Sequence, residues 1–158
     1  MTPGCIDRHR QADAAAVCPG CGGLELRQGL TTIVNGNCGR SAAHFGPAQR
    51  EERLAYLAPG PGEARPELET ETRAGYFASQ PPAPIHTGML VGAGVLRADA
   101  AGYALQRLEK RHYDALHRSL ARALSDGAVG VSLGLGSAPE WFYTHEELIE
   151  ALRHPSGG

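Results

Sequence analysis

The stretch Leu30-Thr31-Thr32-Ile33-Val34-Asn35-Gly36-Asn37-Cys38-Gly39 predicts a β-strand that runs into a tight turn. β-Branched residues fill four of its first five positions, a composition typical of strands. The two glycines allow the backbone to turn sharply and to approach a ligand. Cys38 therefore follows directly on a strand, either as a metal-binding thiolate or as a buried free thiol.

Strand and helix patterns alternate on both sides of this segment. Further strands are predicted at 5–6, 85–91 and 128–133, and helices at 12–17, 48–57, 100–125 and 144–152. The helix over 100–125 has the strongest pattern, because leucines recur at three and four residues, with Asp99 as its N-cap and Gly127 as its stop. Thr144 and Glu147 form a capping-box pattern at the start of the last helix. Such alternation indicates an α/β fold with a parallel sheet.

Composition narrows the class of protein. With 42% hydrophobic residues the chain is not disordered by composition. Residues 59–84 are rich in Pro and Gly and are expected to form a loop or a poorly packed excursion. A net charge of -2 offers no basic surface for nucleic acid or for a membrane, and no apolar run reaches the ~20 residues that span a bilayer. We expect a cytoplasmic protein with reduced cysteines and neither nucleic-acid nor membrane partners.

A second polar group follows the first predicted strand, in Asp7-Arg8-His9-Arg10-Gln11. The carboxyl ends of parallel strands share one edge of a sheet, where reactive groups gather. Side chains two residues apart along a strand can reach one ion, so His9 is a candidate metal ligand, with a satisfied polar histidine as the alternative. Gln11 is a poor second ligand because its amide oxygen is neutral. The turn Val91-Gly92-Ala93-Gly94 has a suitable shape but carries no ligand side chain.

Cys18-Pro19-Gly20-Cys21 forms the kind of knuckle used in zinc ribbons. One knuckle supplies two of the four ligands of a structural zinc, and the sequence contains no second knuckle. A small structural zinc module on Cys18 and Cys21 is therefore one alternative, and an incidental pair of loop thiols is the other. His112, on the apolar stripe of the long helix, is expected to pack rather than to bind a ligand.

Three segments together resemble the N-acyl-D-amino-acid deacylases of the amidohydrolase superfamily. They are Pro3 to His9, Leu26 to Gly39 and Asp126 to Gly136, in the family's order, and Glu140, Phe142, Thr144, Glu146, Glu147 and Leu148 continue the likeness. The resemblance implies a metal-dependent TIM barrel. It also implies hydrolysis of small N-acyl-D-amino acids by a zinc-activated water.

The resemblance also implies a ligand set that this chain matches in part. Asp7 and His9 match the family's Asp-x-His-x-His pattern, whereas Gln11 stands at its second histidine. The family's ligand cysteine falls on Cys38, and a ligand histidine falls on Ala93. His9 and Cys38 are therefore the metal residues expected for Zn, and no catalytic residue is assigned.

A complete barrel of this type has eight βα units in about 250 residues. With 158 residues, the chain is expected to form one incomplete domain over 1–158, a partial TIM-type (β/α) barrel of about four βα units and a fragment of a longer enzyme. Exposed sheet edges would then favour association with another chain. Two ligands do not hold a catalytic zinc easily, so we expect no turnover from this chain alone. A non-catalytic relic is the remaining alternative.

Overall fold

The computed structural model describes residues 3–13, 22–47, 50–57, 68–104 and 106–153. The strands are β1 (Cys5–Asp7), β2 (Leu30–Asn35), β3 (His86–Met89), β4 (Val91–Gly92) and β5 (Val131–Ser132). The helices are α1 (Gly23–Arg27), α2 (Arg50–Leu57), α3 (Arg73–Ala78), α4 (Ala93–Ala101), α5 (Lys110–Ser125), the 3₁₀ helix η3 (Glu140–Phe142) and α6 (His145–Ala151). Among these residues, no helix has the length and apolar character needed to cross a membrane.

All strand pairs of the described residues are parallel, which confirms the predicted α/β class. β1 pairs with β2 and β2 pairs with β3, while β4 pairs with β5. Only Leu90 separates β3 from β4, and its N–H donates to the Asn35 carbonyl, 3.0 Å away. One run of chain therefore pairs first with β2 and then with β5, so that strands consecutive in sequence are neighbours in space.

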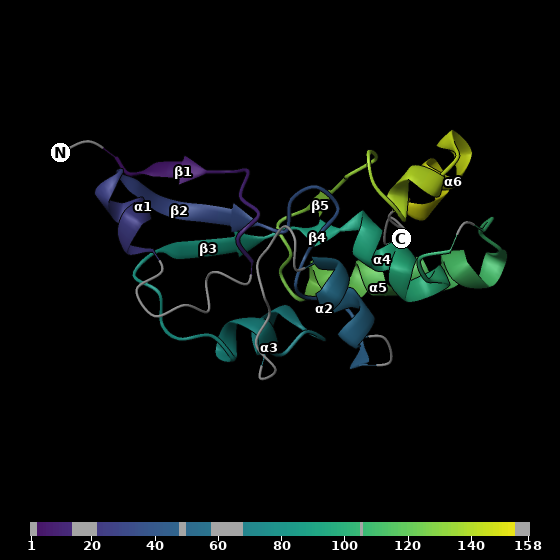
Figure 1. Cartoon of the computed structure of the whole chain (residues 1–158), viewed down its shortest axis with the longest axis horizontal. Coiled ribbons are helices and arrows are strands. Elements are labelled where there is room, and N and C mark those ends of the chain that lie inside the picture. Colours follow the sequence, from purple (N-terminus) through teal and green to yellow (C-terminus); the bar gives the residue numbers. More distant parts are fainter. Residues whose placement is uncertain (1–2, 14–21, 48–49, 58–67, 105, 154–158) are drawn as a thin grey trace.

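The elements divide the molecule along its long axis. Figure 1 shows β1, β2 and β3 side by side toward the N-terminal end, with α4, α5 and α6 gathered toward the other end. The largest buried apolar cluster joins β4 to these helices through Val91, Leu96, Leu116, Leu120 and Ala151. A second cluster contains Met89, Leu68 and Tyr76. Leu68 and Tyr76 belong to the Pro/Gly-rich stretch, so the described part of that stretch packs against the sheet and contains α3.

The predicted helix over 100–125 is wrong as a single element. α4 ends at Ala101, and its C-cap Gly102 has a φ of 73° and a ψ of -171°, which suit glycine and stop the helix. α5 begins only at Lys110, after the N-cap Glu109, whose side chain forms a reciprocal capping box with His112. Asp99 is not an N-cap: it lies inside α4 and pairs with Arg53 at 2.9 Å. Leucine periodicity detected the apolar face but not the break.

Other predicted elements agree more closely with the structure. β2 forms over the predicted residues, and Thr144 caps α6 in the predicted capping box with Glu147. The strand expected over 128–133 shortens to Val131–Ser132, because Gly127 and Gly130 take positive φ values of 90° and 151°. The helix expected over 12–17 lies largely outside the described residues.

Candidate metal site

His9 and Cys38 meet at the carboxyl edge of the parallel sheet. β1 ends at Asp7, and its carboxylate accepts a hydrogen bond from the His9 N–H at 3.0 Å. β2 ends at Asn35, and the following turn carries Cys38. The distance between His9 Nε2 and Cys38 Sγ is 3.4 Å. Two side chains that are 29 residues apart in sequence thus become neighbours, because parallel strands end at one edge.

Gln11 joins the pair as a third polar group. Its Nε2 donates to Cys38 Sγ at 2.9 Å. His9, Gln11 and Cys38 therefore converge on one point, with His9 and Gln11 exposed and Cys38 half-buried. The Gln11 amide therefore supplies a hydrogen bond to the sulfur.

The turn that carries Cys38 has a constrained backbone. Cys38 itself has a φ of 54°, a conformation that side-chain-bearing residues seldom adopt. The Asn37 side-chain amide donates to the carbonyls of Val34 at 2.8 Å and Arg10 at 3.1 Å, which ties the turn to both strand ends. This bonding restrains the backbone that presents the thiol.

Asp13 also stabilises this turn, and the sequence patterns did not identify it as a site residue. Its two carboxylate oxygens accept hydrogen bonds from the N–H groups of Gly36 and Ala42, each at 3.1 Å. Its side chain is fully buried, and this desolvation raises the pKa of Asp13 to about 6 against the lowering effect of those bonds. Polar residues at alternate positions 7, 9, 11 and 13 were the signal that could have identified it.

Two further residues reach the turn from distant parts of the chain. The Ser132 hydroxyl, at the end of β5, accepts a hydrogen bond from the Gly39 N–H at 3.0 Å and donates to the Gly36 carbonyl. The Glu140 carboxyl is buried and accepts a hydrogen bond from the Gly134 N–H at 2.9 Å. Desolvation raises the pKa of Glu140 to about 7. No local sequence signal separates these two residues from ordinary polar residues.

The remaining expected positions contribute no ligand. Ala93 is buried at the first turn of α4 and presents a methyl group. His112 packs as expected, with its Nδ1 accepting from the Glu109 N–H at 3.0 Å. Cys18 and Cys21 lie outside the described residues. Within the described ranges, no group of three or more His, Cys, Asp or Glu side chains could hold a metal ion.

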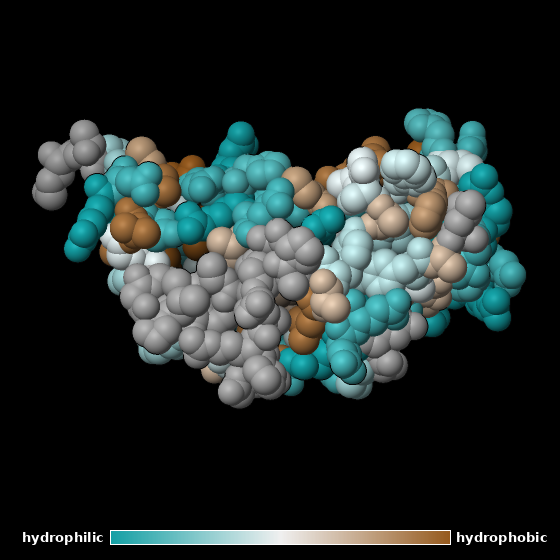
Figure 2. All heavy atoms as spheres, in the orientation of Figure 1, coloured by the Kyte–Doolittle hydropathy of each residue, from teal (hydrophilic) through white to brown (hydrophobic). Residues whose placement is uncertain are grey.

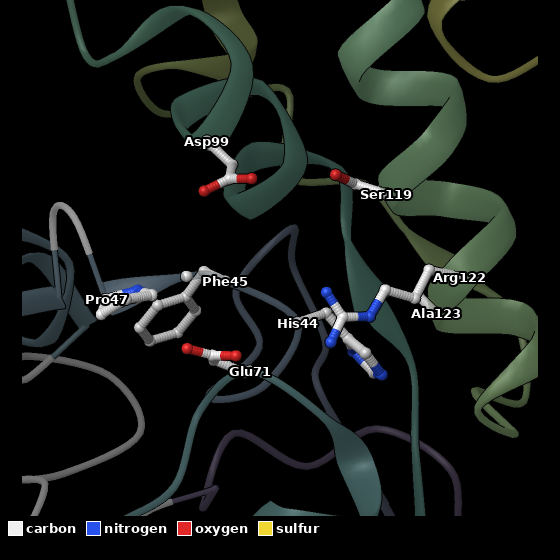
Figure 3. Close-up of a pocket in the computed structure, with 9 residues that line it drawn as sticks. His44, Phe45, Pro47, Glu71, Asp99, Ser119, Arg122 and Ala123 are labelled. Carbon is white, nitrogen blue, oxygen red and sulfur yellow. The ribbon is translucent and has the colours of Figure 1, made fainter.

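A separate cavity of about 230 Å³ lies away from the Cys38 turn. Figure 3 shows its walls, with Arg122 and Ser119 from α5, Asp99 from α4, and His44 and Glu71 from two loops. Neither His9 nor Cys38 lines it. His44 is buried at a φ of 75°, with its Nε2 3.7 Å from the Asp126 carboxylate, and desolvation lowers the pKa of His44. Its ring is one wall of a cavity distinct from the Cys38 site.

Known proteins are similar to this chain in both sequence and fold. The chain is 34% identical to a D-aminoacylase of Alcaligenes xylosoxydans xylosoxydans over 97% of this chain and 31% of the relative. It is 35% identical to an N-acyl-D-glutamate deacylase of the same organism over 88% of this chain and 28% of the relative. No family model matches the sequence.

Solved structures give the same result. The structure of N-acyl-D-glutamate deacylase from Bordetella bronchiseptica, complexed with zinc and a phosphonate inhibitor, superposes with a TM-score of 0.75 at 34% identity over 94% of this chain and 31% of that chain. A D-aminoacylase structure superposes with a TM-score of 0.71 at 26% identity. Fold and sequence together identify an amidohydrolase chain. Within that class, it is similar in sequence and fold to the N-acyl-D-amino-acid deacylases, and it spans about a third of the length of the relatives it matches.

Proposed function

We propose that this chain forms the part of an N-acyl-D-amino-acid deacylase barrel that carries two zinc ligands, His9 and Cys38. The observation that carries the proposal is the distance of 3.4 Å between His9 Nε2 and Cys38 Sγ. A zinc ion with a thiolate at ~2.3 Å and an imidazole nitrogen at about 2.0–2.1 Å in tetrahedral geometry keeps these two donors about 3.6 Å apart. The pair therefore fits a shared zinc ion.

The barrel assignment extends the strand order that Figure 1 shows. Parallel strands that follow one another in both sequence and space, each joined to the next through helices, are the repeating unit of a (β/α) barrel. β1, β2, the β3–β4 run and β5 make about four such units, in one incomplete domain over 1–158. A full barrel has eight, and the chain's share of its relatives' length, 31%, accords with a partial barrel.

In this proposal the chain's own residues organise the metal site. A bound zinc ion would supply an activated water for hydrolysis of the substrate amide. His9 and Cys38 would hold the ion, while Gln11 donates a hydrogen bond that stabilises the thiolate. Asp13 and Ser132 would keep the turn in place through the hydrogen bonds described above. The substrate would be a small N-acyl-D-amino acid in the cytoplasm, with no nucleic acid or membrane involved.

Metal binding tests the site directly. We expect the metal-free protein to bind Zn²⁺ in calorimetric titration, and His9→Ala or Cys38→Ser to weaken that affinity at least about tenfold, because each removes one of two ligands. His145→Ala and Cys5→Ser are matched controls at exposed positions elsewhere. Binding that survives both ligand variants but disappears in Cys18→Ser would contradict the proposal and support the structural zinc module. Absence of metal binding would support the relic.

Hydrolysis tests the expected lack of activity. Two ligands and no assigned proton shuttle leave the chain without a complete centre, so zinc-loaded protein incubated with N-acetyl-D-amino acids should release no more amino acid than buffer does. Release that stops when a chelator is added would show that this chain is a competent enzyme.

A further inference from the structure

We propose that Glu140 is a positioning residue for Cys38, because its buried carboxyl group holds the backbone of the turn that presents the thiol. Glu140 opens η3, 102 residues beyond Cys38, and only 2% of its surface is exposed. A residue of a charged type is seldom so deeply buried unless it has a bonding partner, which Gly134 provides here. The inference rests on the proposed function only where it treats Cys38 as a metal ligand.

The Glu140 carboxyl fills a space that three glycines leave open. Its Oε1 accepts from the Gly134 N–H at 2.9 Å. A Cβ atom on Gly39 would lie 1.6 Å from Oε2, and one on Gly94 would lie 2.8 Å from it. Glu140 therefore contacts the Cys38 turn through Gly39, the first turn of α4 through Gly94, and the segment after β5 through Gly134.

Several contacts hold Gly39 in place, and one of them is with Glu140. Its N–H donates to Ser132 Oγ at 3.0 Å, and its carbonyl accepts from the Val95 N–H at 3.3 Å. The Glu140 carboxyl packs against its Cα, where a side chain would otherwise stand. Since Gly39 directly follows Cys38, these contacts restrict the Cys38–Gly39 peptide, which is attached to the Cα atom that carries the thiol side chain.

Gly134 extends the same contact to Cys38 itself. A Cβ atom on Gly134 would lie 2.1 Å from the Cys38 carbonyl oxygen, so the two backbones pack directly against each other. The hydrogen bond from Gly134 to Glu140 keeps that backbone in place. Glu140 thus acts on the residues on both sides of the Cys38–Gly39 peptide without touching the thiol, and its role is to position it.

The test measures how quickly Cys38 reacts with a disulfide reagent in metal-free protein. In a parent with Cys5, Cys18 and Cys21 changed to Ser, Cys38 is the single thiol. Glu140→Ala should raise the labelling rate at least about tenfold, because the turn loses its buried partner. Glu140→Gln keeps the shape and the acceptor and should stay within about twofold of the parent. Glu146→Ala, an exposed acid on α6, is the matched control.

A second readout follows Co²⁺ binding through the absorption of the Co²⁺–thiolate bond. Glu140→Ala should weaken Co²⁺ affinity about tenfold and Glu140→Gln should restore it. The labelling arm needs no metal, so a protein that binds no Co²⁺ would refute the proposed function while leaving the positioning role measurable.

Labelling of folded Glu140→Ala at the parent rate would overturn the positioning role, and so would Glu140→Gln labelling as quickly as the alanine variant. If Glu140→Ala does not fold, Glu140→Asp replaces it. Its side chain is one methylene shorter and should label faster than Glu140→Gln, and equal rates for these two variants would also overturn the role.

Discussion

At the scale of single residues, the site consists of two candidate ligands and a set of groups that hold the turn carrying Cys38. His9 and Cys38 could be predicted because each follows a strand by a few residues, and parallel strands bring such positions together. Ser132 and Glu140 could not, because their role depends on contacts across 93 and about 100 residues of chain. Asp13 is an intermediate case. It continues the alternating polar positions 7, 9 and 11, but this pattern did not by itself predict a role for it.

Asp13 gives the protein a predictable pH dependence. Its pKa is raised by burial from 3.8 to about 6. The folded state therefore holds its proton more tightly than the unfolded state, and the associated stability is present below about pH 4 and is lost as the pH rises through about 6.

Asp13→Ala should accordingly cost roughly 2 kcal/mol more at pH 4 than at pH 7, in addition to the loss of two hydrogen bonds at both pH values. Urea unfolding at the two pH values measures the difference. Glu51→Ala, at an exposed position on α2, serves as the control. An equal cost of Asp13→Ala at pH 4 and pH 7 would show that burial does not perturb this carboxyl group.

At the scale of elements, sequence patterns predicted the helix and strand features that depend on neighbouring residues. The β-branched run of β2 and the Thr144–Glu147 capping box of α6 both form as predicted, because neighbouring residues determine them. The break between α4 and α5 was not predicted, since the leucine period continues through it. The conformation of Gly102 and the Glu109–His112 capping box produce that break. Tertiary packing favours this broken arrangement over one continuous helix.

Gly102→Ala tests this reassignment. The backbone at Gly102, with a φ of 73° and a ψ of -171°, lies in a region open almost only to glycine, so alanine should lower the free energy of unfolding by about 1–3 kcal/mol. Chemical denaturation followed by circular dichroism measures both stability and helix content. A more stable and more helical variant would instead favour one continuous helix.

At the scale of the whole molecule, the sheet carries apolar side chains at its two outer strands. Ile6 on β1 is 60% exposed, and Val129 and Leu133, on either side of β5, are 61% and 43% exposed. Figure 2 shows hydrophobic surface over β1 and α1 in this view. In a closed barrel, further strands would pair with both edges, so exposure of these residues accords with the chain's 31% share of its relatives' length.

The exposed edges lead us to expect self-association of the isolated chain. Light scattering after size exclusion should show a mass above that of a monomer of 16.7 kDa, rising with concentration. Ile6→Lys should shift the distribution toward monomer, because a charged residue on an edge strand opposes pairing. Ile149→Lys, on exposed α6, should not. A monomer at every concentration would show that the edges are protected.

X-ray absorption at the zinc edge of the zinc-loaded protein tests the central claim most directly. A zinc ion shared by His9 and Cys38 should show one sulfur neighbour at ~2.3 Å and nitrogen or oxygen neighbours at about 2.0–2.1 Å, with the sulfur signal lost in Cys38→Ser. Two or more sulfur neighbours, or a sulfur signal that persists in Cys38→Ser, would contradict it.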